Sequence, residues 1–132
     1  MKITVDTNVL IRAVVRDHEK QAIAADRILK SAEIIAVTLP CLCEFVWVLR
    51  RLYEFDREDI AAAIQALADT ENVTLNRPAV EAGLAILNAG GDFADGLIAY
   101  EGNWLGAVTF VSFDKKAVTL LARRRYEARL LH

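Results

Sequence analysis

The sequence predicts an α/β domain with a mainly parallel sheet and helices on both faces. Short apolar runs alternate along the 132 residues with longer segments of helical periodicity. Some of these runs lack the polar alternation of a strand with one wet face, which is typical of buried parallel strands. Hydrophobic residues make up 55% and charged residues 26%, enough for a packed core and unlike a disordered chain. With no internal repeat or linker, residues 1–132 are expected to form a single domain.

Composition and charge narrow the function classes. The formal net charge is −2, which by itself points to no nucleic-acid or membrane partner, although a local basic patch would be enough for one. No apolar run approaches the roughly 18 residues of a membrane span, and the N-terminus lacks the features of a signal peptide. Cys41 and Cys43 would point apart on a helix, so we expect core thiols in a reducing compartment. A cytoplasmic protein without a membrane partner is therefore expected.

The first element is a strand that runs directly into a helix. Ile3 and Val5 alternate with polar residues, and Asp6 then stands where the strand ends and the helix begins. That junction lies at the carboxyl edge of a sheet, where open α/β folds bind their ligands. Asp is also a good helix N-cap, so Asp6 has two interpretations at this point.

The remaining elements follow from periodicity, caps and breakers. Thr38 caps a helix with Pro40 in its first turn, and the pair of glycines at 90 and 91 closes another helix. The expected strands are residues 2–5, 34–37, 73–75, 107–113 and, as a last edge strand, 129–132. The expected helices, besides the first one, are residues 20–30, 38–53, 58–70, 78–88, one starting at 92–95, and 115–125.

Further acids stand at comparable places downstream. Glu44 interrupts an apolar helix, where it serves either a site, an exposed face or a pair with Arg51. Asp92 and Asp95 are three apart, so both face the same side of a helix start, where the helix dipole stabilises them while they repel each other. Asp114 follows the best strand of the chain and repeats the pattern of Asp6.

In a parallel sheet all these acids can fall at the same carboxyl edge. Carboxylates gathered there repel one another unless a hard divalent cation with oxygen ligands compensates them. Mg²⁺ bound in this way suits in-line attack of water on a phosphodiester. The sequence offers no competing chemistry, since it has no glycine-rich phosphate loop, no nucleophile-elbow motif and no histidine base beside an acid.

These residues resemble the four acidic motifs of the PIN domain family. The resemblance covers essentially the whole chain, and its length and element order are similar to those of the VapC-type toxins of bacterial toxin–antitoxin pairs. Each motif is weak alone, whereas four in the right order are strong. The matching segments are Asp6-Thr7-Asn8-Val9-Leu10, Glu44-Phe45-Val46-Trp47-Val48-Leu49, Asp92-Phe93-Ala94-Asp95 and Val111-Ser112-Phe113-Asp114.

The resemblance implies a three-layer α/β/α sandwich and an endoribonuclease that depends on Mg²⁺ or Mn²⁺. It further implies a toxin that forms a homodimer and is held inactive by a cognate antitoxin protein. The acids that match the metal-holding and catalytic positions are Asp6, Glu44, Asp95 and Asp114. Asp92 matches an extra acid of many members and is either a metal ligand or a helix cap.

Three smaller positions complete the comparison with the family. Asn8 and Ser112 are expected to support the site. Gly96 departs from the pattern, because Ala is commoner there, and a glycine inside a helix predicts a looser helix start at a cost of up to about 1 kcal/mol.

Other functions remain open from the sequence. One is a PIN-like module that binds RNA or a partner without cutting; others are a DNA-directed nuclease or a phosphatase that uses the same acids. Asn8 argues against phosphatases with an aspartyl nucleophile, which have a second Asp at that position. No substrate-binding residue is assigned, since the four basic residues beside the motifs could contact phosphates or form a solvated helix face. These are Arg12, Arg16, Lys115 and Lys116, while residues 123–125 suit the surface or an acidic antitoxin segment.

Overall fold

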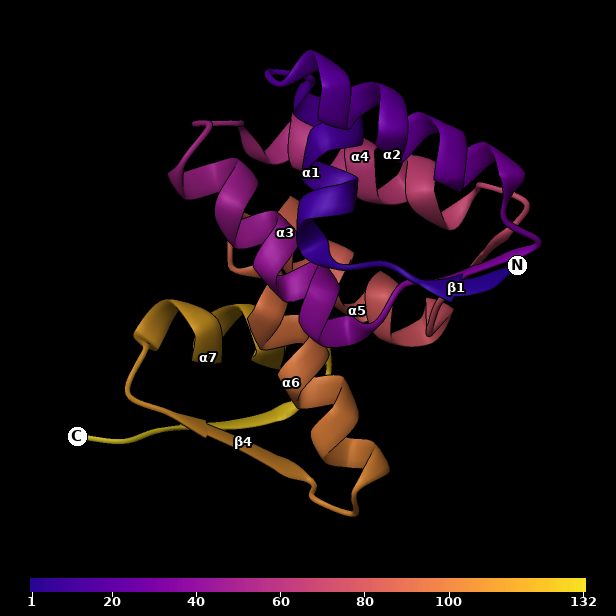
Figure 1. The fold of residues 1–132 in the computed structure, drawn as a ribbon. Coiled ribbons are helices and arrows are strands. Elements are labelled where there is room, and N and C mark those ends of the chain that lie inside the picture. The colour runs from indigo at the N-terminus through magenta and orange to yellow at the C-terminus, as the bar shows by residue number, and fades with distance from the viewer. The chain divides into compact units, whose positions relative to one another are not determined.

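The structure, a computed structural model, describes all 132 residues. The chain divides into two compact units, an N-terminal unit of Met1–Asn76 and a C-terminal unit of Arg77–His132. Figure 1 shows the helices and strands of each unit. No helix combines the length and the apolar character needed to cross a membrane.

The N-terminal unit holds a parallel sheet of three strands, in the order β1-β2-β3. The strands are β1 (Lys2–Thr4), β2 (Ile34–Ala36) and β3 (Val73–Thr74). Thr4 lies opposite Ala36, and Ala36 lies opposite Thr74. The carboxyl ends of the three strands therefore lie along one edge, and the chain segments that follow them start from that edge.

Four helices complete this unit. They are α1 (Thr7–Val15), α2 (Glu19–Ser31), α3 (Leu39–Arg51) and α4 (Arg57–Ala68). The predicted cap of α3 is confirmed, because the side chain of Thr38 accepts a hydrogen bond from the Cys41 N–H over 3.4 Å. The apolar faces of α1, α3 and α4 bury Ile11, Phe45 and Ile64 almost completely. Helical periodicity in the sequence thus located these helices correctly.

The C-terminal unit begins with two helices, α5 (Arg77–Asn88) and α6 (Phe93–Trp104). Gly90 has a φ of +99°, and the N–H groups of Gly90 and Gly91 donate to the carbonyls of Leu87 and Ile86. This pattern is a Schellman motif, so the predicted closure of α5 by two glycines is confirmed. The turn delivers the chain directly to Asp92.

The rest of the C-terminal unit is a parallel strand pair joined through a helix. The elements are β4 (Thr109–Ser112), α7 (Lys115–Arg123) and β5 (Glu127–Leu130), with β4 and β5 parallel. Buried Leu120 and Leu121 of α7 form a core cluster with Ile86, and Phe110 of β4 packs against it. Residue 114 therefore lies between a strand and a helix that are both fixed by packing.

The predicted α/β class with mainly parallel strands is confirmed, and some boundaries differ. Helix α7 ends at Arg123 instead of residue 125, since Arg125 adopts a left-handed φ of +69°. Strand β4 starts only at Thr109, because Gly106, with a φ of +100°, continues the turn after α6. The last strand is Glu127–Leu130 instead of residues 129–132. Ile34, expected to be buried, is 37% exposed, whereas Ile35 is 1% exposed, so β2 has one accessible face.

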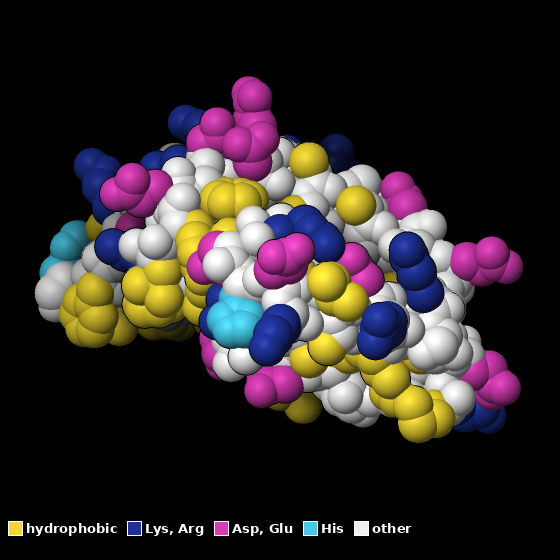
Figure 2. All heavy atoms as spheres, turned by 45° about the horizontal axis from the view of Figure 1, so that its top comes forward, with side chains coloured by type: hydrophobic (Ala, Val, Ile, Leu, Met, Phe, Trp, Pro, Cys, Tyr) yellow, Lys and Arg dark blue, Asp and Glu magenta, His cyan; other side chains and the backbone are white.

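Charges of both signs are interspersed on the face shown in Figure 2. This distribution agrees with the small net charge of −2. Attraction of a polyanion would therefore depend on local groups of basic side chains rather than on a broad field.

Candidate active site

Asp6 occupies the N-cap position of α1, directly after β1. The Val5 N–H still donates to the Ala36 carbonyl over 3.3 Å, so the chain leaves the sheet at Asp6. Oδ1 of Asp6 accepts a hydrogen bond from the Thr7 N–H at 2.7 Å. A conventional cap bonds an N–H one or two residues further on. Asp6 thus holds the helix start through one oxygen and leaves the other exposed.

Glu44 lies in the second turn of α3 and is exposed, although the adjacent Phe45 is fully buried. The expected alternative of a pair with Arg51 is wrong, because no ion pair joins Glu44 to Arg51. Glu44 therefore lies on an exposed helix face, and its carboxylate forms no ion pair.

Asp6 and Glu44 both influence the thiol of Cys41. The Thr7 hydroxyl donates to Sγ of Cys41 over 3.7 Å, which ties the start of α1 to the start of α3. Burial raises the pKa of the Cys41 thiol, and the charges of Asp6 and Glu44 raise this pKa further. Both carboxylates therefore act on the same thiol. Cys41 is 8% exposed, as expected for a core thiol.

The C-terminal unit contains three of the acids, and two of them, Asp92 and Asp114, act on the third, Asp95. Asp92 is the N-cap residue of α6 but makes no side-chain cap hydrogen bond. Asp95, in the first turn, is partly buried. Burial raises the pKa of Asp95 above its ordinary value, and the charges of Asp92 and Asp114 raise this pKa further. The side chain of Asp92 thus does not cap α6. Burial and the charges of Asp92 and Asp114 make the ionised form of Asp95 less favourable.

Asp114 is a true helix cap. Its Oδ1 accepts from the N–H groups of Lys116 and Ala117, at 3.0 and 3.2 Å. The hydroxyl of Ser112 accepts from the Asp114 N–H at 2.9 Å and fixes the backbone at the end of β4. Because the cap uses Oδ1 alone, capping and metal binding are compatible at Asp114.

Gly96 permits a close approach of α6 to α5. A Cβ added at Gly96 would lie 2.7 Å from Cα of Gly83 and would also collide with the carbonyl oxygen of Ala82. Both obstacles are backbone atoms, which cannot swing aside. The expectation of a looser helix start is therefore corrected: the glycine is buried and lets α6 pack tightly beside Asp95.

The donor chemistry fits a hard divalent cation. Within each unit, no three His, Cys, Asp or Glu side chains are grouped so that they could hold a metal ion. The acids that match the motifs offer carboxylate oxygens, the ligands that Mg²⁺ and Mn²⁺ prefer. A cation beside Asp95 would also relieve the repulsion that raises its pKa.

The basic residues beside the motifs differ in whether they form ion pairs. Arg12 pairs with Asp17 at 2.8 Å, and Arg16 pairs with Asp26 at 2.9 Å. Lys115 and Lys116 are exposed at the start of α7. Arg12 and Arg16 are therefore neutralised by neighbouring aspartates. For Lys115 and Lys116, phosphate contact and a solvated helix face both remain open.

Asn8 and Thr7 behave differently within the first motif. Asn8 lines a hollow of about 420 Å³ between α1 and α2. Thr7 is 3% exposed, and its contact with Cys41 was missed by sequence reasoning. Its place between Asp6 and Asn8 in the motif was the one available signal.

Comparison with protein families gives a match over most of the chain. The profile of the PIN domain family matches residues 3–124. All five acids of the four motifs lie within the matched segment. No curated protein matches the sequence.

Proposed function

We propose that this chain, which belongs to the PIN domain family, is an endoribonuclease that hydrolyses RNA phosphodiester bonds with Mg²⁺ or Mn²⁺. Membership of the family indicates a metal-dependent nuclease in general terms. The observation that carries the proposal is the raised pKa of the Asp95 carboxyl, which is caused first by burial and then by the charges of Asp92 and Asp114, because a bound cation would offset these costs of ionisation.

The proposed roles follow the motifs. Asp6, Glu44, Asp95 and Asp114 are the proposed metal ligands because they match the acidic motifs of the family, with Asp92 as a fifth carboxylate. A divalent ion held by these acids would lower the pKa of a bound water and stabilise the leaving oxygen of the phosphodiester.

The chain's own hydrogen bonds support these roles. Asp6 and Asp114 each commit only Oδ1 to a helix start, so each keeps an oxygen for a metal. Ser112 holds the backbone of Asp114, in agreement with the supporting role that the sequence predicts. Asp92 makes no side-chain cap bond, which favours the ligand interpretation over the cap.

The biological role is proposed from the resemblance to VapC-type toxins. In this proposal the protein is a cytoplasmic toxin, forms a homodimer and is inhibited by a cognate antitoxin. Large apolar side chains on the C-terminal unit support a protein partner, since Trp104 is 75% and Leu105 83% exposed, and Phe113 is 74% exposed.

A cleavage assay tests the enzymatic proposal. Purified protein is incubated with a labelled single-stranded RNA, or with DNA of the same sequence, in Mg²⁺, Mn²⁺ or EDTA. We expect cleavage of RNA in either metal and none in EDTA. Cleavage that persists in EDTA would contradict the metal proposal, and preferential cleavage of DNA would contradict the RNA proposal. Binding without cleavage in either metal would favour a non-cutting module.

A further inference from the structure

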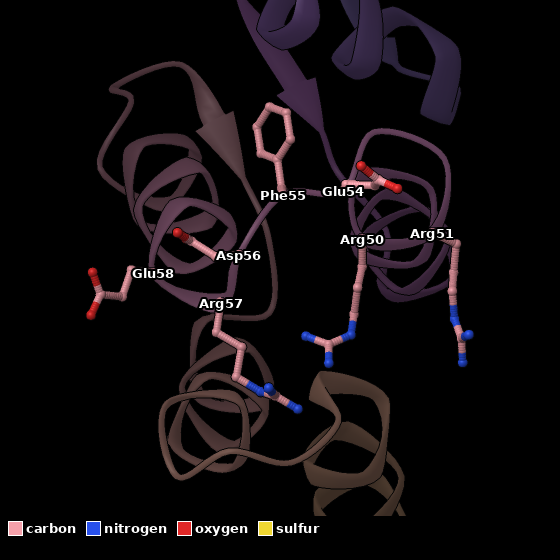
Figure 3. Close-up of a pocket in the computed structure, with 7 residues that line it drawn as sticks. All are labelled: Arg50, Arg51, Glu54, Phe55, Asp56, Arg57 and Glu58. Carbon is pink, nitrogen blue, oxygen red and sulfur yellow. The ribbon is translucent and has the colours of Figure 1, made fainter.

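Three arginines of the N-terminal unit form what we call the arginine cluster: Arg50, Arg51 and Arg57. They line a hollow of about 760 Å³ at the connection from α3 to α4. Figure 3 shows the guanidinium groups of Arg50 and Arg57 extending toward one another, with Arg51 pointing to the same side. None of the acids that match the family motifs lies in this hollow.

Nearby acids form no ion pair with the arginine cluster. Glu54, Asp56 and Glu58 also line the hollow, yet none of them forms an ion pair. Asp56 is committed as the N-cap of α4, where its Oδ1 accepts from the Asp59 N–H at 2.8 Å. Figure 3 shows the carboxylate of Glu58 pointing away from the three guanidinium groups. The hollow therefore holds three acids and three arginines, but none of the acids lies close enough to a guanidinium group to form an ion pair.

Arg57 is the member that local structure explains least. It is the first residue of α4, where the positive end of the helix dipole disfavours a cation. Its Nε is buried and has no hydrogen-bond partner. Arg50 and Arg51 have an ordinary reason for their place, since cations suit the last turn of α3. Because Nε is shielded from solvent, an anion in the hollow would meet the terminal nitrogens of the Arg57 guanidinium group.

The arginines of α1 provide the contrast. Arg12 and Arg16 are each neutralised by an aspartate. No member of the arginine cluster has such a partner. The three guanidinium groups are thus free of ion pairs within the chain.

We propose that Arg50, Arg51 and Arg57 bind backbone phosphates of the RNA strand. The proposal rests on the proposed function for its choice of ligand. Guanidinium forks match phosphate oxygens in a bidentate way, which favours arginine over lysine at such a place. A chain of net charge −2 needs local positive charge to hold a polyanion against its own acids. Contacts of this kind hold the strand without reading its sequence.

Binding in EDTA tests this proposal separately from cleavage. The affinity of a fluorescently labelled single-stranded RNA is measured by anisotropy over a series of salt concentrations. The variants are Arg57→Gln and the double variant Arg50→Gln/Arg57→Gln. The control is Arg27→Gln, which removes an exposed arginine of α2 that forms no ion pair.

We expect both cluster variants to weaken binding to every RNA sequence alike, by about tenfold for the double variant. The salt slope should fall by about 0.7 for each phosphate that a variant no longer neutralises. The control should keep the affinity and slope of the wild type. Arg51→Gln, which alters an exposed side chain, should weaken binding in the same direction and serves if Arg57→Gln fails to fold.

The outcomes separate this inference from the proposed function. Unchanged RNA affinity and slope in the double variant would overturn the inference, even if the wild type cleaves RNA in Mg²⁺. Loss of binding to a polyglutamate peptide, with RNA binding unaffected, would assign the arginine cluster to an acidic protein and also overturn it. Weakened RNA binding in a protein that never cleaves would uphold the inference and contradict the proposed function.

Discussion

The acids of the two units differ in what surrounds them. In the N-terminal unit, Asp6 and Glu44 are exposed, and the group they both influence is the Cys41 thiol. In the C-terminal unit, Asp95 is partly buried, and the charges that influence it are those of Asp92 and Asp114. A carboxylate beside a neutral thiol costs little, whereas a carboxylate beside two others stores repulsion.

Because of this difference, neutralising substitutions in the two units should affect the stability of the metal-free protein differently but should affect cleavage alike. Neutralising an acid of the N-terminal unit should leave the fold almost unchanged. Neutralising Asp95 should relieve repulsion in the metal-free protein. If both groups hold metal, either change should abolish cleavage.

The largest effect is expected for Asp6→Asn. Its RNA cleavage rate should fall by more than about a hundredfold, since even the groups that merely orient metal ligands cost roughly 10- to 100-fold when removed. Melting should change little, because Asn can still cap α1. Glu71→Gln, at an exposed acid outside the motifs, should cleave normally. A purified Asp6→Asn protein that is folded and active would remove Asp6 from the metal site.

Glu44→Gln tests the other acid of this pair. The change should also abolish cleavage, although Glu44 lies on an exposed helix face. Turnover on the same RNA is compared with that of Glu81→Gln, an exposed glutamate of α5. A loss of less than roughly threefold in the cleavage rate of Glu44→Gln would correspond to under about 1 kcal/mol and would assign Glu44 to the solvent-facing surface.

The packing beside Asp95 can be tested with two glycines of α6. Gly96→Ala should destabilise the protein by about 1–3 kcal/mol, because the new methyl group meets backbone atoms of α5. Gly102→Ala has open space around its Cβ position and should be neutral or stabilising by up to about 1 kcal/mol. Denaturant unfolding measures both. Equal effects at the two positions would mean that α5 and α6 do not require the close approach at Gly96.

A smaller effect is expected from pH in EDTA. The pKa of Asp95 is raised in the folded protein, so the folded state binds this proton more tightly than the unfolded state. The stability that the bound proton confers is present below the unfolded pKa and is lost as pH rises through the folded pKa. The melting temperature of Asp95→Asn should therefore gain on that of the wild type between about pH 4 and pH 7. A constant difference across this range would contradict the raised pKa of Asp95.

Much of the fold was predictable because its signals are local. Thr38 predicts the start of α3, and the glycines at 90 and 91 predict the end of α5. The structure confirms both helix ends. The sequence-based predictions failed where the backbone of another element determines the role of a residue. Gly96 looks like a weakness in its own helix, and only the approach of α5 explains it.

The candidate site was predictable in part for the same reason. The acids were identified by their places after strands and at helix starts, and their order matches the family. The sequence could not tell that Asp92 makes no cap bond or that Thr7 contacts Cys41, since both depend on side-chain positions. The arginine cluster was also missed, because an arginine at a helix end is ordinary until its partners are known.

We propose that Asp95 belongs to a group of carboxylates that holds a divalent cation. This claim is tested most directly by melting the wild type and Asp95→Asn in EDTA and in Mg²⁺. In EDTA, Asp95→Asn should melt at or above the wild type, because one repelling charge is gone. Mg²⁺ should stabilise the wild type by about 2.7 kcal/mol at a hundred times its dissociation constant, and Asp95→Asn much less. Equal Mg²⁺ shifts for the two proteins, or no shift in either, would contradict the claim.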